Sequence, residues 1–349
     1  MSLRIGVLTF HRCINYGSYW QARCLVEGLN ALGHQAELLD HRSASIDRAE
    51  WRCALQPIPA LPDHRAEYAA KTRKFFSAFA ALPLSPAIAL EQPESMEDYD
   101  LVLIGSDEVW NLRHPWYGGQ RLFYGEGVRA NRIAAYAASF GNQSDSLPSA
   151  WGRRLARLDA ISVRDANSRG IVAGAVGAAP ALVLDPCLAF ADCIPVQRAD
   201  AAAPYLAVYG HGFPPWFQTQ IMRWARETGR RVVSIGYANP FADIQLIDVS
   251  PEGFAALMAG ADAIATNFFH GCVFALANGK PFVTAPSDYR FNKIRDLTDL
   301  LGAQQHRVAE TDDAERYAAL LSVPPGAAVA DAIVGLRRQS EAYLHAVLA

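Results

Sequence analysis

The six cysteines of this 349-residue chain are scattered, and no two of them form a CxxC pair. No combination of His and Cys has the spacing of a zinc site, so no dedicated metal centre is expected. A basic excess is also absent, because 32 Lys and Arg residues stand against 35 Asp and Glu residues, for a net charge of −3. A general nucleic-acid-binding protein would normally be basic. We therefore expect a protein of a reducing compartment without a nucleic-acid partner.

Long hydrophobic runs are missing as well. No stretch approaches the ~20 apolar residues of a membrane-spanning helix. The N-terminal sequence MSLRIGVLTF has only a short apolar run, which is typical of a first strand and not of a signal peptide. We expect a cytoplasmic protein with no transmembrane segment, for which peripheral association with a membrane stays open.

The chain is too long for one ordinary domain, and its hydrophobic content of 51% is enough for two cores. Residues 4–10 and 35–41 have the composition of buried strands, and residues 22–32 between them have helical spacing. This β-loop-α-β unit is of the Rossmann type, although its loop lacks the GxGxxG fingerprint of dinucleotide binding. A strand at residue 205 follows an Ala-rich linker, residues 199–204.

The expected fold class is therefore α/β, with two Rossmann-like domains facing a cleft. The N-terminal domain is expected to cover residues 1–190, including an irregular and partly helical insertion at residues 43–98. The C-terminal domain is expected to cover residues 200–335, followed by a terminal helix at residues 336–349. The clearest further elements are strands at residues 99–105, 132–139, 160–164, 231–236 and 281–285 and helices at residues 151–158, 217–228 and 251–260.

Polar loops follow several of these strands. In doubly wound sheets, ligands bind beyond the carboxyl ends of the strands. Polar loops on that side of both halves therefore predict a cleft between the domains. The loops are residues 11–19, 105–111, 139–141 with 162–165, 266–271 and 287–295.

The stretch at residues 265–283, ATNFFHGCVFALANGKPFV, places His270 at the expected start of a helix. Unpaired backbone amides and the positive end of the helix dipole favour an anion there. A histidine beside an anion is a candidate general acid or base near neutral pH. Its neighbours Asn267 and Gly271 are candidates for binding the same anion. The structural alternative is a buried histidine that is hydrogen-bonded to a carbonyl.

Three residues in the loop that follows the first strand are candidates for lining the cleft. Asn15 and Tyr16 offer hydrogen bonds, and Gly17 would let a ligand approach the backbone. The alternative for all three is a turn stabilised by Asn and Gly.

The loop after the strand at residues 99–105 carries Ser106, Asp107 and Trp110. Asp107 is a candidate base or a partner for a sugar hydroxyl, with Ser106 beside it in the cleft. Both residues are also good N-caps, which is the structural alternative. Trp110 is interpreted either as a core residue or as a platform on which a sugar stacks.

Arg164 ends the apolar strand ISVR, where a guanidinium can grip a carboxylate or phosphate with two parallel hydrogen bonds. The alternative is a structural pair with Asp165, although adjacent residues on an extended strand point to opposite faces. A short basic cluster, Arg290, Lys293 and Arg295, follows a strand of the second half. A solvated helix face would explain the cluster, but its position indicates that Lys293 meets an anion.

Several segments, spread from residue 6 to about 300, share their order and spacing with a known family. They are GVLTFHRCINYGSYWQ, IGSDEVWN, YAASFG, ISVRD, LDPCL and ATNFFHGCVFALANGKPFV, and together they resemble the polysaccharide pyruvyl transferase family. The resemblance implies a two-domain arrangement similar to GT-B glycosyltransferases. It implies transfer of pyruvate from phosphoenolpyruvate onto two hydroxyls of a sugar, which gives a cyclic ketal, with no cofactor besides that donor substrate. The implied acceptor belongs to an exopolysaccharide, a cell-wall glycan or a glycan on a lipid carrier.

The resemblance also assigns roles by position. His270 falls on the family histidine, for which a general acid role is expected, while Arg164 and Lys293 fall on two cations that would grip the anionic groups of the donor. One departure is Phe268, because a better-characterised branch has an arginine at this position, two residues before the histidine. Either another cation replaces that arginine, or the donor is different.

Two other functions stay open from the residues. A GT-B glycosyltransferase that uses a nucleotide-sugar would also place basic residues and a helix N-terminus at a diphosphate. A non-catalytic glycan-binding relative would tolerate Phe268. We expect a pyruvyl transferase because His270, Arg164 and Lys293 are all in place.

Overall fold

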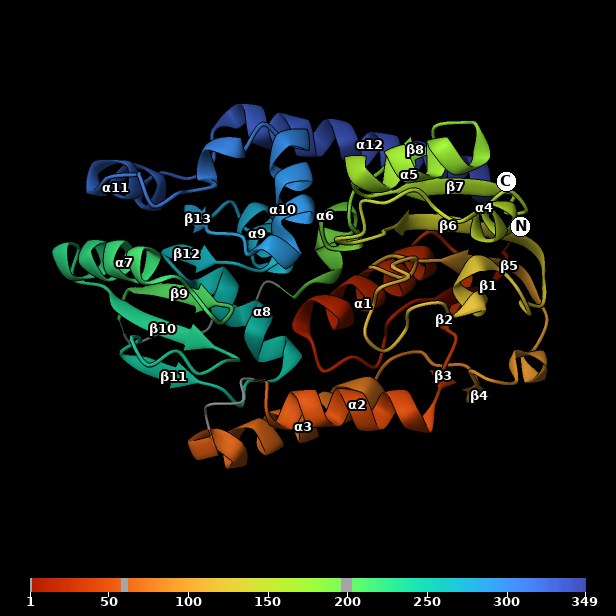
Figure 1. Ribbon diagram of the computed structural model, residues 1–349, viewed down its shortest axis with the longest axis horizontal. Helices are drawn as coiled ribbons and strands as arrows, with labels where there is room; N and C mark the ends of the chain where they lie inside the picture. The colour runs from red at the N-terminus through yellow and green to blue at the C-terminus, as the bar shows by residue number, and fades with distance from the viewer. Residues whose placement is uncertain (1, 58–61, 196–202) are drawn as a thin grey trace. The chain divides into compact units, whose positions relative to one another are not determined.

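The structure is a computed structural model that describes residues 2–57, 62–195 and 203–349 (Figure 1). Most of the linker predicted at residues 199–204 lies outside the described residues. The chain divides into two compact units, and each unit is built from segments that are far apart in the sequence.

The two units do not follow the predicted division of the chain into an N-terminal and a C-terminal part. Part of the predicted insertion, Cys53–Ala78, groups with the second unit, and the C-terminal segment Val334–Ala349 groups with the first. The remainder of the first unit is Met1–Arg52 and Phe79–Cys193, and the remainder of the second is Ile194–Ile333.

The first unit is built on a parallel sheet of β2 (Gln35–Leu38), β1 (Arg4–Leu8), β5 (Tyr99–Ile104), β6 (Ala130–Ala138), β7 (Ala160–Val163) and β8 (Ala181–Leu182), in that order. The inner strands are short apolar runs with buried side chains, as is typical of a parallel sheet covered on both faces. Val7 of β1 pairs with Leu38 on one side and Leu103 on the other. The strand order therefore changes direction between β1 and β5.

Helices and a small second ladder complete the first unit. Its apolar core contains the buried aromatic residues Phe10, Trp110, Phe123 and Phe140. The elements are α1 (Tyr16–Ala31), α2 (Ala44–Leu55) up to Arg52, α4 (Ser149–Leu155), α5 (Ala166–Val176), α6 (Pro186–Ala189), the later part of α12 (Ala327–Leu348), and the paired strands β3 (His41–Arg42) and β4 (Ile88–Ala89).

The second unit is built on a parallel sheet of β11 (Ile244–Leu246), β10 (Arg231–Ile235), β9 (Tyr205–Tyr209), β12 (Ala263–Thr266) and β13 (Phe282–Thr284), in that order. Here the strand order changes direction between β9 and β12. The helices are α3 (Arg65–Ala80), which belongs to this unit up to Ala78, α7 (Pro215–Glu227), α8 (Pro251–Gly260), α9 (Phe269–Ala277), α10 (Asp288–Leu300) and α11 (Ala314–Ser322).

These two sheets confirm the predicted α/β class with Rossmann-like units. The largest errors in the predicted helix boundaries are at α1 and α12. α1 begins at Tyr16 and not at residue 22, because Asn15 caps it and aromatic side chains fill its first turns. α12 begins at Ala327, earlier than the expected terminal helix.

His41 ties β3 to the end of β1, since its Nε2 donates a hydrogen bond to the Thr9 carbonyl at 2.8 Å. Burial, with a smaller contribution from His11, lowers the pKa of His41 to about 3. Between that value and the ordinary value of about 6.5, the unfolded chain binds a proton that the folded chain does not bind. The free energy of unfolding is therefore expected to fall as the pH drops through this window, by up to about 1.4 kcal/mol per pH unit.

Urea unfolding of the wild type and His41→Gln at a series of pH values across this window measures the contribution. In the variant, the unfolding free energy is expected to change less steeply with pH. The difference in slope is expected to be about 1.4 kcal/mol per pH unit, which corresponds to one proton. Equal slopes in the two proteins would contradict a neutral His41 in the folded state.

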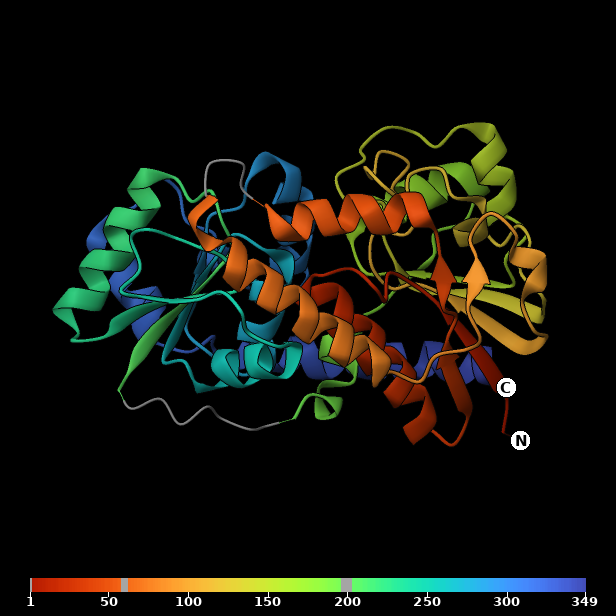
Figure 2. The same cartoon turned by 90° about the horizontal axis from the view of Figure 1, so that it is seen from below.

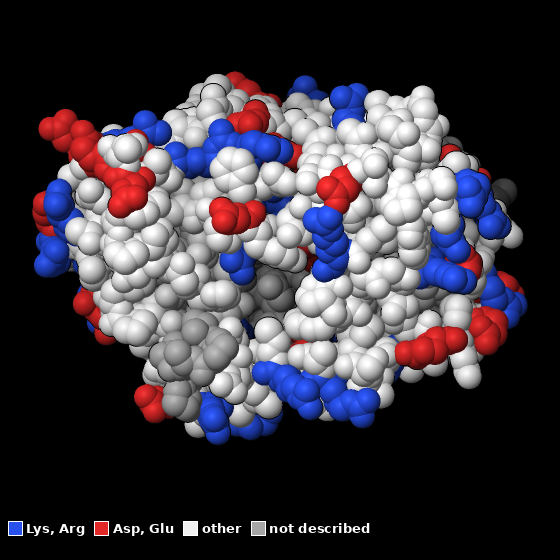
Figure 3. Space-filling view, in the orientation of Figure 1, with Lys and Arg blue, Asp and Glu red and all other residues white. Residues whose placement is uncertain are grey.

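No single helix in the described parts of the chain is long and apolar enough to cross a membrane. α11 and α12, which are bent by 54° at the break between them, meet that length and composition only as a pair. Acidic and basic side chains are interspersed on the face of the molecule seen in Figure 3.

Candidate functional site

Each sheet has one point at which the strand order changes direction, and most of the predicted site residues lie at these two points. Ligands of doubly wound sheets bind beyond the carboxyl ends of the strands at such a switch point. In the first unit, the switch point lies between β1 and β5, with Asn15 and Ser106 in the loops that follow. In the second unit it lies between β9 and β12, where His270 follows β12.

Asp107 is the centre of a buried polar network at the switch point of the first unit. Its Oδ2 accepts a hydrogen bond from Ser18 Oγ at 2.8 Å, and its Oδ1 accepts one from Arg164 Nη2 at 3.0 Å. The backbone at Asp107 is left-handed, with φ of 69°, a conformation that non-glycine residues adopt at a cost and often at functional positions. Both carboxylate oxygens are thus held, so Asp107 offers a fixed negative charge between β1 and β5.

The Arg164 side chain is only 1% exposed and joins the ends of three strands. Besides Asp107, it binds Asp185 Oδ2 through Nη1 at 2.7 Å, and the same nitrogen lies 3.3 Å from Ser106 Oγ. Burial alone would lower the pKa of Arg164, but the carboxylates of Asp107 and Asp185 raise it above the usual value. The neighbouring Asp165 caps α5, because its carboxylate accepts a hydrogen bond from the Ser168 amide. Arg164 would therefore have to keep its ion pairs with Asp107 and Asp185 while it binds a ligand anion.

The other predicted residues of the first unit have clear structural roles. Asn15 caps α1 by accepting from the amides of Gly17 and Ser18, so Tyr16 and Gly17 lie in the first helical turn and not in a loop. Ser106 donates from Oγ to the Ala137 carbonyl at 2.9 Å. Trp110 is 0% exposed and donates from Nε1 to the Phe123 carbonyl at 2.7 Å. Trp110 is thus a core residue here and does not offer a stacking surface.

At the switch point of the second unit, side chains after β12 hold the loop after β9. Thr266 Oγ1 donates to the Tyr209 carbonyl at 2.6 Å, and Asn267 Nδ2 donates to the His211 carbonyl at 2.8 Å. α9 begins directly afterwards, so His270 is buried in its first turn, where the amides point towards the carboxyl edge of the sheet. The predicted position of His270 at a helix start is therefore found in the structure.

Gly271 lets α9 approach β12 closely. A Cβ at this position would lie well inside van der Waals contact of Thr266 Oγ1, the oxygen that holds the Tyr209 carbonyl. Gly271→Ala is expected to lower the free energy of unfolding by about 1–3 kcal/mol, as overpacking usually does.

Urea unfolding checks the Gly271 prediction, with Gly174→Ala as the matched control. Gly174 lies within α5 and a Cβ there meets open space, so the control is expected to be neutral or slightly stabilising. An equal effect of the two substitutions would contradict the packing role of Gly271.

Phe268, the residue that departs from the better-characterised branch, carries a cation on its ring. The guanidinium carbon of Arg290 lies 4.2 Å from the ring centre of Phe268, within the range of a cation–π contact. Lys293, one turn further along α10, is buried and its Nζ lies 5.5 Å from the ring of Tyr289. Arg290 therefore places positive charge next to the position at which that branch has its arginine, and the sequence analysis had favoured Lys293.

Two further residues of this region, Lys71 and His211, were missed by the sequence analysis. His211 follows β9 and contacts Phe268 edge-on at 5.4 Å. Lys71 lies on α3, and its Nζ is 4.2 Å from the ring centre of Tyr237. A histidine directly after the strand YLAVY was a usable signal, whereas nothing local connects Lys71 to this edge of the sheet.

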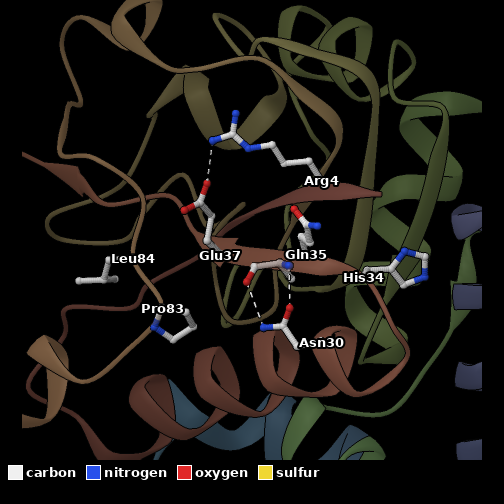
Figure 4. Close-up of a pocket in the computed structure, with 8 residues that line it drawn as sticks. Arg4, Asn30, His34, Gln35, Glu37, Pro83 and Leu84 are labelled. Atoms are coloured by element: carbon white, nitrogen blue, oxygen red, sulfur yellow. Dashed lines mark hydrogen bonds and ion pairs between the residues drawn. The ribbon is translucent and has the colours of Figure 1, made fainter. Parts of the chain in front are cut away.

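A cavity of about 500 Å³ lies elsewhere in the first unit (Figure 4). It is lined by Arg4 and Gln35, the first residues of β1 and β2, and by Asn30, which exchanges two hydrogen bonds with the backbone of Ala36. These residues lie at the amino ends of the strands. The cavity is thus at the edge of the sheet opposite to Ser106 and Asp107 and does not belong to the candidate site.

Several solved structures are similar to the chain at low sequence identity. A glycosyltransferase of Streptomyces sp. SF2575, complexed with thymidine diphosphate, is 14% identical, with a TM-score of 0.48 over 99% of this chain and 100% of that chain. A UDP-GlcNAc 2-epimerase of Methanocaldococcus jannaschii is 12% identical, with a TM-score of 0.49 over 96% of this chain and 99% of that chain. These likenesses are distant, so we base the fold assignment on the strand order of each sheet.

No curated protein matches the chain by sequence. The family model described as polysaccharide pyruvyl transferase matches residues 15–289, which include the loops after β5, β9 and β12. The match covers most of the chain and confirms the resemblance found in the sequence motifs. The chain belongs to the polysaccharide pyruvyl transferase family.

Proposed function

We propose that the protein transfers pyruvate from phosphoenolpyruvate to two hydroxyls of a sugar in a surface glycan or exopolysaccharide precursor and forms a cyclic ketal. The observation that carries the proposal is the family match over residues 15–289, with His270 in the first turn of α9 at a switch point. We place this reaction in the cytoplasm, with phosphoenolpyruvate as donor substrate and no further cofactor.

The donor is an anion with a carboxylate and a phosphate, and the second unit offers positive charge to it. Arg290 and Lys293 both lie on α10, and the first amides of α9 add partial positive charge. We assign donor binding to these groups together with Asn267 and Gly271, which shape the loop and the helix start. Fixed positive groups of this kind also stabilise the charge that develops on a departing phosphate.

The proposed reaction needs one proton donor and two hydroxyl nucleophiles. Protonated His270 gives its proton to the methylene carbon of the enol, so that the adjacent carbon becomes an oxocarbenium-like centre. A first sugar hydroxyl attacks that carbon, phosphate leaves as its C–O bond breaks, and a second hydroxyl closes the ketal. Of the two hydroxyl protons, one leaves with the phosphate, and the other is taken up by a base and released to solvent, from which a proton restores the protonated His270. Asp107 is the candidate base for a hydroxyl, and its fixed carboxylate is also suited to orient one.

Calorimetric titration of the purified protein with phosphoenolpyruvate and with nucleotide-sugars tests the donor class. Binding of phosphoenolpyruvate, together with phosphate release when an acceptor glycan is added, is the expected result. Binding and turnover of a nucleotide-sugar without phosphoenolpyruvate binding would identify a glycosyltransferase instead. Binding of a glycan without turnover of either donor would identify a non-catalytic relative.

A further inference from the structure

Three basic side chains of the second unit gather around a pair of aromatic rings. Arg290 lies over Phe268 at 4.2 Å, and Lys71 lies over Tyr237 at 4.2 Å. The two rings contact each other at 5.3 Å between centres, and the imidazole of His211 contacts both, at 5.4 Å from Phe268 and 5.2 Å from Tyr237. We call Lys71, His211 and Arg290 the basic triad.

Lys71 reaches this place because α3, the orange helix that runs diagonally in Figure 2, packs on the loop after β10. The Ala238 amide donates to the hydroxyl of Tyr68 at 2.9 Å, and Lys71 Nζ donates to the Gly236 carbonyl at 2.8 Å. Tyr68 and Lys71 are three residues apart and so share one face of the helix. The position of the ammonium is therefore set by two contacts of α3 with one loop.

His211 is held from its backbone. The Asn267 side chain donates to the His211 carbonyl at 2.8 Å, and the Asn239 side chain donates to the Gly210 carbonyl at 2.9 Å. Gly210 has a φ of 142°, and a Cβ there would collide with Asn267 Oδ1. Side chains after β12 and β10 thus fix the loop that presents the imidazole next to the switch point.

The basic triad carries a local excess of positive charge. Burial, and after it repulsion from Arg290 and Lys71, lowers the pKa of His211 to about 4. These two are the charged groups that act on the imidazole, from α10 and α3, while Tyr237 and Phe268 pack on it from the loops after β10 and β12. A bound anion would reduce this repulsion.

We propose that the basic triad is a subsite for a phosphoryl group, in which Lys71 and His211 act together with Arg290. A phosphoryl group carries three acceptor oxygens and close to two negative charges, so it can accept from donors that approach from three different elements. A guanidinium and an ammonium are the side chains that most often bind it. The proposed function identifies the phosphoryl group as that of the donor. A diphosphate that links an acceptor glycan to its carrier has the same chemistry. It is the second candidate source of the phosphoryl group that the subsite binds.

Calorimetric titration of the full chain with inorganic phosphate tests the subsite without any turnover. Lys71→Gln is expected to weaken phosphate binding by about tenfold or more, the scale of a hydrogen bond between charged groups. Lys74→Gln is the matched control, because Lys74 lies on the same helix and forms an exposed ion pair with Asp248 at 2.8 Å. Arg290→Gln on α10 is the second variant, with the same expected loss if Lys71→Gln does not fold.

The pKa of His211, measured from its imidazole signal in NMR, distinguishes a phosphate subsite from a purely structural role of these residues. Phosphate is expected to raise the pKa of His211 in the wild type. In the free Lys71→Gln protein, that pKa is expected to rise towards its ordinary value, because one repelling charge is gone. Unchanged phosphate affinity in both variants, or no phosphate binding to the wild type, would overturn the subsite.

Competition separates the two sources of the phosphoryl group and separates this inference from the proposed function. Displacement of phosphate by phosphoenolpyruvate, but not by pyruvate, supports the donor as source, whereas displacement by a short prenyl diphosphate, but not by phosphoenolpyruvate, supports the acceptor. Phosphate binding that depends on Lys71, in a protein that never transfers pyruvate, supports the subsite and contradicts the proposed function. Pyruvate transfer with phosphate affinity unchanged in Lys71→Gln contradicts the subsite alone.

Discussion

His270→Gln is expected to lower the turnover of phosphoenolpyruvate by about a hundredfold or more, which is the usual effect of losing a general acid. Glutamine retains a hydrogen-bonding side chain of similar size but cannot deliver a proton to the enol methylene. His270 lies in the first turn of α9, the helix whose first amides the proposed function assigns to donor binding. Donor binding is therefore expected to survive in part, because Arg290, Lys293 and the helix amides are still present.

The alternative for His270 is a purely structural role in the packing of α9. Turnover and melting temperature measured on the same preparation separate the two, with His64→Gln as the matched control. His64 lies before α3 and pairs with Glu67, so this variant is expected to keep full activity. A folded His270→Gln protein that turns over the donor at the rate of the wild type would contradict the general acid role.

Arg164→Ala is expected to destabilise the first unit by about 3–5 kcal/mol, the scale found when one partner of a buried ion pair is removed. The guanidinium is enclosed between Asp107 and Asp185, and its loss would leave both carboxylates buried without that partner. Because Arg164 joins the ends of β5, β7 and β8, the loops at the switch point would also lose their common anchor. Arg164→Lys is expected to recover part of the loss, since an ammonium cannot bind both carboxylates with the same geometry.

Urea unfolding at neutral pH measures this effect, with Arg113→Ala as the control. Arg113 forms an ion pair with Asp145 in which both side chains are about 60% exposed, and such surface pairs contribute about 0–1 kcal/mol. An Arg164→Ala protein that is as stable as Arg113→Ala, and that has lost only donor affinity, would show that Arg164 serves the ligand and not the fold.

Sequence patterns were sufficient for the elements whose signals are local. β5, β9 and β10 are apolar runs bounded by polar residues, and the structure places each within about one residue of its prediction. α8 spans Pro251–Gly260 as predicted, because Ser250 caps it and proline occupies its first position. The position of His270 at the start of a helix was predictable for the same reason, since the apolar residues after Gly271 continue with helical spacing.

The partners of the site residues could not be predicted, because they depend on contacts between distant segments. Arg164 was expected to pair with Asp165 or with a ligand, and its carboxylates come instead from Asp107 and Asp185, which follow other strands. Lys71 lies in a segment that was assigned to an insertion of the first half, and it contacts Gly236 of the second unit. Arg290 was seen only as part of a basic cluster, and its position over Phe268 depends on how α10 packs.

Following the carbon of the donor tests the central claim most directly. Purified protein is incubated with ¹³C-labelled phosphoenolpyruvate and with glycan and lipid-linked glycan fractions, and the products are analysed by mass spectrometry and NMR. We expect the label to appear in the glycan as a ketal, with one phosphate released for each ketal and no transfer by His270→Gln. Transfer of a sugar from a nucleotide-sugar, with no label from phosphoenolpyruvate in any glycan, would contradict the account.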